Sequence, residues 1–167
     1  MAFTVEDGTG LSDANSYTSV AEADAYFLDR GNGVWDALDA DIKQQSLIKA
    51  TDYLEQRFGS RFLGTSTTEI QALHWPVGDL EEYDVDEIPI KLKYACAEYG
   101  YRASQAELAP DPAVDSSGVT MVRTRQVAGP VEQSFRALDG SAKILRDYPT
   151  ADMYLRDLVT SNSGVIR

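Results

Sequence analysis

The sequence predicts a mainly α protein: a helical bundle with a protruding β-hairpin in its C-terminal region, then a short terminal helix and a tail. Three observations carry this prediction. Apolar residues recur at three- and four-residue steps through much of the first 110 residues. Capping signals precede these runs, and glycine or proline follows them. Residues 119–136 change to short extended runs, around the turn sequence Ala-Gly-Pro.

Three main helices are expected in the body. The first covers Val20–Arg30, where Ser19 and Glu22 form a capping box. The second covers Ala40–Phe58 and repeats apolar side chains along one face. The third covers Pro89–Leu108 and has apolar residues on two faces, which predicts a central helix covered on both sides.

A short fourth helix is expected between the second and third. Ser66 and Glu69 form another capping box, and Pro76 disfavours helical geometry at the residue before it, so this helix would end at Trp75. Three residues are expected to be structural and buried against the bundle: Trp35, Trp75 and Pro76.

The chain is expected to form one domain over residues 1–167. Its helical body would cover about residues 17–110, its hairpin about 119–136, and its C-terminal helix and tail about 149–167. The single cysteine excludes an internal disulfide, and no apolar run approaches the 18 or so residues of a membrane span. We therefore expect no association with a membrane.

The predicted hairpin is the most unusual segment. Two strands alone are only marginally stable in water, so the hairpin should pack against something else. Contact with another chain is favoured, and packing back onto its own bundle is the alternative. For the terminal segment, docking by two apolar anchors and a frayed end are equally weighted alternatives. The candidate interface residues are Arg123, Arg125, Val127, Glu132, Phe135, Val165 and Ile166.

The net charge of −12 is unevenly distributed. Residues 1–118 hold 22 acidic and 8 basic side chains, whereas residues 119–167 hold 5 acidic and 7 basic ones. The body should therefore repel polyanions. Because affinity for nucleic acid depends largely on neutralising phosphates, this balance argues against a general nucleic-acid-binding protein.

Candidate catalytic and metal-binding groups are sparse. His74 is the only histidine, and Cys96 lies among apolar residues of the predicted central helix. The loop Asp79–Glu87 contains six acidic residues, but it lacks the spacing of a calcium loop and is typical of a solvated segment. We therefore expect no catalytic residue, cofactor or metal site, and we do not expect an enzyme.

Several segments occur in an order that carries a resemblance. They are VEDGTGLSDANSYTSVAEADAYFLDRGN, the tryptophan at position 35, ATDYLEQRF, QALHWP, IPIKLKYACAE and VAGPVE. The chain is similar to a family of small tailed-bacteriophage proteins, often labelled DnaT-like single-stranded DNA-binding proteins and regarded as head–tail connectors or adaptors. Where that family usually has arginine after Trp-Pro, this chain has Val77.

The resemblance implies a structural virion protein at the head–tail junction, present in the host cytoplasm during assembly. It would form a homo-oligomeric ring, commonly twelvefold, beneath the portal and would join the DNA-filled head to the tail. Its implied partners are copies of itself, the portal protein, a tail or tail-terminator (stopper) protein, and double-stranded DNA that passes through the lumen. The alternative function is a DnaT-like single-stranded DNA-binding accessory protein of replication.

Overall fold

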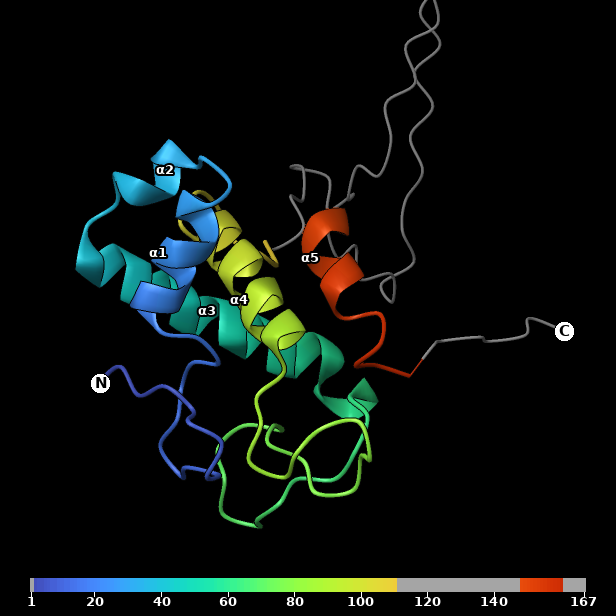
Figure 1. Ribbon diagram of the computed structural model, residues 1–167. Coiled ribbons are helices and arrows are strands. Elements are labelled where there is room, and N and C mark those ends of the chain that lie inside the picture. The colour runs from blue at the N-terminus through green and yellow to red at the C-terminus, as the bar shows by residue number, and fades with distance from the viewer. Residues whose placement is uncertain (1, 111–147, 161–167) are drawn as a thin grey trace, which may run out of the picture. The chain divides into compact units, whose positions relative to one another are not determined.

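The structure is a computed structural model that describes residues 2–110 and 148–160 and is mainly helical (Figure 1). The chain divides into two compact units, Met1–Leu108 with Asp147–Arg167, and Ala109–Arg146. All the described helices belong to the first unit. The predicted hairpin over residues 119–136 and the tail from residue 161 lie outside the described residues.

Helix α1 covers Val20–Leu28 and begins at the predicted capping box. The backbone N–H of Glu22 donates to Ser19 Oγ at 3.2 Å, and the backbone N–H of Ser19 donates to Glu22 Oε2 at 2.8 Å. The short helix α2, Gly33–Asp36, follows and places Trp35 in the core. These two hydrogen bonds confirm the predicted capping box. They satisfy backbone N–H groups that have no partner within the helix.

Helix α3 covers Ala40–Phe58, the range predicted from the sequence. Asp39 is the N-cap residue, yet its side chain makes no capping hydrogen bond. Gly59 stays right-handed at φ −49° and continues into the 3-10 turn η1, Gly59–Arg61. Packing of the apolar face therefore defines this helix more than its caps do.

Helix α4 covers Ile90–Ala103 and is central, since it packs against α1, α3 and α5. It ends five residues before the predicted Leu108. Gly100 allows α3 to approach closely, because a Cβ atom there would lie 2.8 Å from Leu47 Cδ2. Helix α5 covers Pro149–Tyr154, so it begins where the predicted C-terminal helix begins.

The predicted short helix after Ser66 is wrong: residues 62–89 contain no helix. Ser66 Oγ donates to the carbonyl of His74 at 3.0 Å instead of capping a helix. Gln71 Nε2 donates to the carbonyls of Leu73, His74 and Pro76 at 2.8, 2.9 and 3.0 Å. These side chains satisfy the backbone of a compact loop, so no helical ladder is required.

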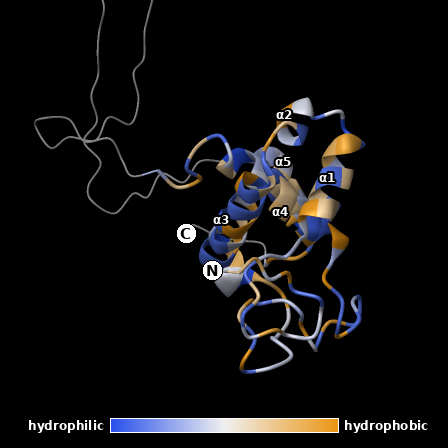
Figure 2. Cartoon of the chain, turned by 90° about the vertical axis from the view of Figure 1, so that its left-hand side faces the viewer, coloured by the Kyte–Doolittle hydropathy of each residue, from blue (hydrophilic) through white to orange (hydrophobic). Residues whose placement is uncertain are grey.

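The core lies among α1, α3, α4 and this loop. Hydrophilic and hydrophobic residues alternate in colour along α3 (Figure 2), as expected for a helix with one buried face. Trp35 packs on Phe27 with ring centroids 5.0 Å apart, and its Nε1 donates to Asp24 Oδ1 at 2.8 Å. The largest fully buried side chains include Trp35, Trp75, Tyr17, Tyr99, Leu47, Leu54 and Leu92.

Candidate functional site

Tyrosine and arginine side chains of α1, α4 and the α5 region form a continuous strip. In α4, Tyr94, Glu98 and Arg102 follow one another at four-residue steps, which places them on one face of the helix. Side chains from α1 and from residues 148–154 complete the set. We call this set the tyrosine–arginine strip: Tyr26, Arg30, Tyr94, Glu98, Arg102, Tyr148 and Tyr154.

One end of the strip is a cation resting on aromatic rings. The guanidinium carbon of Arg30 lies 3.6 Å from the ring centroid of Tyr26 and 5.3 Å from that of Tyr94. Tyr154 lies edge-on to Tyr94, with centroids 5.7 Å apart. Arg30 Nη1 also donates to the carbonyl of Tyr26 at 2.9 Å, so the guanidinium is held in place although the residue is exposed.

The middle of the strip is a hydrogen-bonded group of three residues. The Tyr26 hydroxyl donates to Glu98 Oε1 at 2.9 Å and lies 3.1 Å from the Tyr154 hydroxyl. Burial raises the pKa of Tyr26 far above its ordinary value, and its bonds to Tyr154 and Glu98 add to the effect. Tyr26 therefore stays a neutral donor that fixes one oxygen of Glu98.

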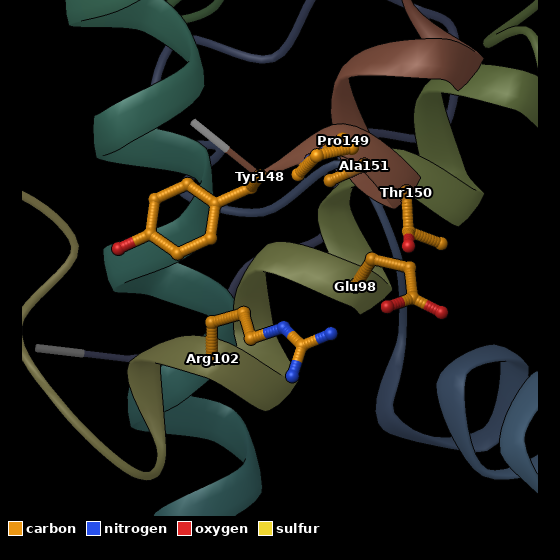
Figure 3. Close-up of a pocket in the computed structure, with 6 residues that line it drawn as sticks. All are labelled: Glu98, Arg102, Tyr148, Pro149, Thr150 and Ala151. Carbon is orange, nitrogen blue, oxygen red and sulfur yellow. The ribbon is translucent and has the colours of Figure 1, made fainter. Parts of the chain in front are cut away.

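The other end of the strip is a pocket of about 230 Å³ between α4 and the start of α5. Glu98 and Arg102 extend into it from α4, and Tyr148–Ala151 form the facing wall (Figure 3). The Tyr148 hydroxyl donates to the carbonyl of Leu108 at 3.0 Å, and its ring lies edge-on to Tyr99. This wall is consequently well anchored in the body.

Most carboxylates around the strip are paired with cations. Lys91 pairs with Asp157, Lys93 with Glu22 at 2.6 Å, and Arg57 with Asp152 at 3.3 Å. The hydrogen bond and charge of Lys91 lower the pKa of the Asp157 carboxyl. By contrast, neither strip arginine, Arg30 or Arg102, lies within 4.0 Å of a carboxylate in residues 2–110 and 148–160. The strip therefore offers two cations in an acidic protein.

This arrangement is suited to a ligand that combines flat rings with negative charge. Tyr94, Tyr148 and Tyr154 are half-buried, so part of each side chain stays accessible. Aromatic rings stack on planar groups, while guanidinium groups bind phosphate or carboxylate oxygens with two parallel hydrogen bonds. Arg30 lies beside the tyrosines at one end of the strip, and Arg102 lines the pocket with Tyr148 at the other, so each end can contact both kinds of group.

The predicted interface residues lie outside this part of the chain. The candidate interface residues of the predicted hairpin and of the tail all lie outside the described residues. These candidates are Arg123, Arg125, Val127, Glu132, Phe135, Val165 and Ile166. Trp35, Trp75 and Pro76 are buried away from solvent. Val77, which replaces the expected arginine, is also buried, at 1% exposure. It therefore presents no side chain to a ligand.

The strip itself was missed from the sequence. The sequence predicted a central helix covered on both sides; Tyr99 is buried there, but Tyr94 and Tyr101 are only half-buried. The four-residue spacing of Tyr94, Glu98 and Arg102 was a signal for one shared face. Nothing local indicated that Tyr26 and Tyr154 would lie beside that face.

The other candidate groups are structural in their geometry. Burial raises the pKa of the Cys96 thiol to about 11, so it is protonated at neutral pH. The loop Asp79–Glu87 lacks helix or strand, and Asp79 Oδ1 accepts from the backbone N–H of Thr65 at 2.6 Å. Within the described residues, no three histidine, cysteine, aspartate or glutamate side chains are grouped to bind a metal.

Across residues 2–110 and 148–160, no helix combines the length and the apolar composition needed to cross a lipid bilayer. The absence of enzymatic activity and of a cofactor stays a prediction, as do the single-domain organisation and the residue-level interface.

A family model described as "Putative DnaT-like ssDNA binding protein" matches residues 1–167. The search of curated proteins and the search of solved structures each returned no match. The head–tail connector interpretation is therefore wrong, together with the bacteriophage and virion-structure properties attached to it, because the match is to an ssDNA-binding family. The match does not by itself test the predicted partners or the predicted location of the protein, which stay predictions.

The error has a physical cause. We weighed the total charge of −12 against binding to nucleic acid. Total charge describes the far field of the molecule, whereas contact depends on the local arrangement of charges. Around the strip, Asp157, Glu22 and Asp152 are paired with cations, whereas Glu98, Arg30 and Arg102 form no ion pair within the described residues.

Proposed function

The chain belongs to the DnaT-like ssDNA-binding family, and on that premise we propose that it binds single-stranded DNA without catalysing a reaction on it. The observation that carries the proposal is the match of the family model over residues 1–167, the full length of the chain. The tyrosine–arginine strip supports the proposal independently, because its chemistry suits this ligand.

In the proposed complex, unpaired bases stack on the accessible rings of Tyr94 and Tyr154. Base–aromatic stacking contributes about 1–3 kcal/mol per base and tolerates any sequence, since every base has a π-face. Arg30 and Arg102 contact the phosphates that flank the stacked bases. Single strands are preferred over duplex because the bases of a duplex are already stacked and paired.

The predicted hairpin and its interface residues stay predictions. Arg123 and Arg125 belong to the part of the chain in which basic residues outnumber acidic ones. For the hairpin, contact with another chain is favoured, and packing back onto its own bundle is the alternative.

Fluorescence anisotropy with a labelled single-stranded oligonucleotide of mixed sequence, in about 0.1 M salt, tests the proposal. We expect the wild-type protein to bind it more tightly than the matching duplex. The double variant Arg30→Gln/Arg102→Gln should bind at least about tenfold more weakly, because two charge-assisted contacts are removed.

Lys49→Gln is the matched control. Lys49 is an exposed cation on α3, which contributes no residue to the strip, and its replacement removes a positive charge without changing the strip. Its affinity should stay within about twofold of wild type. Absence of wild-type binding, or equal losses in the control and the double variant, would refute the proposed interface.

A further inference from the structure

We propose that the pocket between α4 and the start of α5 binds one guanine base of a single strand. This inference rests on the proposed function and deepens it: the strip binds any sequence by stacking, and the pocket adds a preference for one base. The pocket is lined by Glu98, Arg102, Tyr148, Pro149, Thr150 and Ala151.

The buried carboxylate of Glu98 is the first argument. The residue is only 9% exposed, and its Oε1 accepts a hydrogen bond from the Tyr26 hydroxyl at 2.9 Å. Its Oε2 receives no hydrogen bond from the described residues, although the side chain lines the pocket (Figure 3). This oxygen is not among the buried polar atoms that lack a partner, so it is open to the pocket, where a ligand donor can replace water on it.

The relation between Glu98 and Arg102 is the second argument. A glutamate four residues before an arginine on a helix normally favours an ion pair. Here no ion pair within 4.0 Å joins them, and Tyr26 binds the carboxylate instead. Both charged groups line the pocket separately, so one can bind hydrogen-bond donors while the other binds a phosphate.

The size of the pocket limits the ligand. Its volume of about 230 Å³ is below the roughly 300–1,000 Å³ of pockets that enclose drug-sized molecules. A single base fits this scale, with its sugar and phosphate left at the opening. The apolar parts of Tyr148, Pro149 and Ala151 provide surfaces against which a flat ring can pack.

The donor pattern of the bases identifies guanine. Its Watson–Crick edge presents two adjacent donors, N1–H and the N2 amino group, which match the two oxygens of a carboxylate. Cytosine and adenine each place an acceptor nitrogen beside their amino group, and thymine places two carbonyl oxygens beside its N3–H. These acceptors would face Glu98 and repel it, so each of the other bases makes a poorer pair.

Binding of mononucleotides, followed by two-dimensional amide NMR on the full chain, tests the pocket separately from strand binding. We expect dGMP to shift the amide signals of Thr150 and Ala151, and dAMP, dCMP and dTMP to bind at least about tenfold more weakly. The Arg102→Gln variant should bind deoxyguanosine and dGMP with the same affinity, because the variant has lost the contact with the phosphate.

The variant Glu98→Gln separates recognition from a structural role. Its amide oxygen still accepts from the Tyr26 hydroxyl, so the fold is kept. The glutamine amide has one acceptor and one donor, which suits adenine or cytosine. The preference for guanine should therefore be replaced by a preference for one of these two bases. Glu107→Gln, at an exposed position outside the pocket, is the control and should retain the guanine preference.

The outcomes distinguish this inference from the proposed function. Equal binding of all four mononucleotides, no shift at Thr150 and Ala151, or an unchanged preference in Glu98→Gln would overturn the guanine pocket. If oligonucleotides still bound, the proposed function would stand without it. If dGMP bound at the pocket but no oligonucleotide bound, the pocket would stand and the proposed function would fail.

Discussion

Glu6 organises the N-terminal turn from within. Its side chain is 1% exposed, and its two oxygens accept hydrogen bonds from the backbone N–H groups of Gly8, Gly10 and Leu11 at 3.0, 2.9 and 2.9 Å. The chain can curl around this carboxylate because Gly8 has φ +100°, a value that residues with a Cβ atom rarely adopt.

Replacing Gly8 by alanine should destabilise the protein by at least about 2 kcal/mol. The added Cβ atom would lie 1.8 Å from the carbonyl oxygen of Asp86, a backbone atom that cannot move away alone. Chemical denaturation measures the change. Gly33→Ala is the control, since nothing lies within 4 Å of its Cβ position and the residue is helical. Equal stabilities of the two variants would contradict this account.

At the scale of elements, two capping sequences have opposite outcomes. Ser19 and Glu22 begin α1, whose apolar residues Ala23 and Phe27 are buried. Ser66 and Glu69 begin no helix, and Ile70 beside them is 74% exposed. A capping box contributes only about 1 kcal/mol, so it produces a helix where an apolar face can also be buried.

The loop over residues 62–89 is held by Trp75. Its ring is fully buried and lies edge-on to Tyr83, with centroids 5.4 Å apart. Truncating Trp75 to alanine should lower the free energy of unfolding by about 3–5 kcal/mol, because it leaves a large cavity. Thermal denaturation would detect this. Ile70→Ala, in the same loop but exposed, should change stability by less than about 0.5 kcal/mol.

If the Trp75→Ala and Ile70→Ala variants had the same melting temperature, contacts other than those of Trp75 would hold the loop. The side-chain hydrogen bonds of Gln71 to three carbonyls would then be the leading explanation.

At the scale of the whole molecule, the charge of −12 and the proposed ligand have the same sign. Repulsion acts over the Debye length, which is about 30 Å at 0.01 M salt and about 8 Å at 0.15 M. Contacts at the strip act over a few ångströms. The approach of the strand and the final complex should therefore respond differently to salt.

We expect the association rate constant for single-stranded DNA to rise with salt between about 0.01 and 0.15 M, because screening removes the long-range repulsion. Stopped-flow fluorescence measures it. A strand of the same sequence with an uncharged peptide backbone is the control and should show little salt dependence. A rate constant that falls as salt increases would mean that a basic surface steers the encounter.

The sequence by itself determined the helical class, the range of α3, the capping box that begins α1 and the proline that begins α5. These features depend on residues three or four positions apart, which a linear pattern records. It did not determine the loop over residues 62–89, where Gln71 replaces the predicted helical ladder.

Only the tertiary structure decided the candidate site. The Tyr26 hydroxyl reaches Glu98 across 72 positions of sequence and Tyr154 across 128. No periodicity in the chain encodes such a meeting, because it depends on how α1, α4 and α5 pack together. The same packing keeps Glu98 and Arg102 unpaired beside one pocket. A local pattern predicts which face a residue shares, but only packing decides what lies opposite that face.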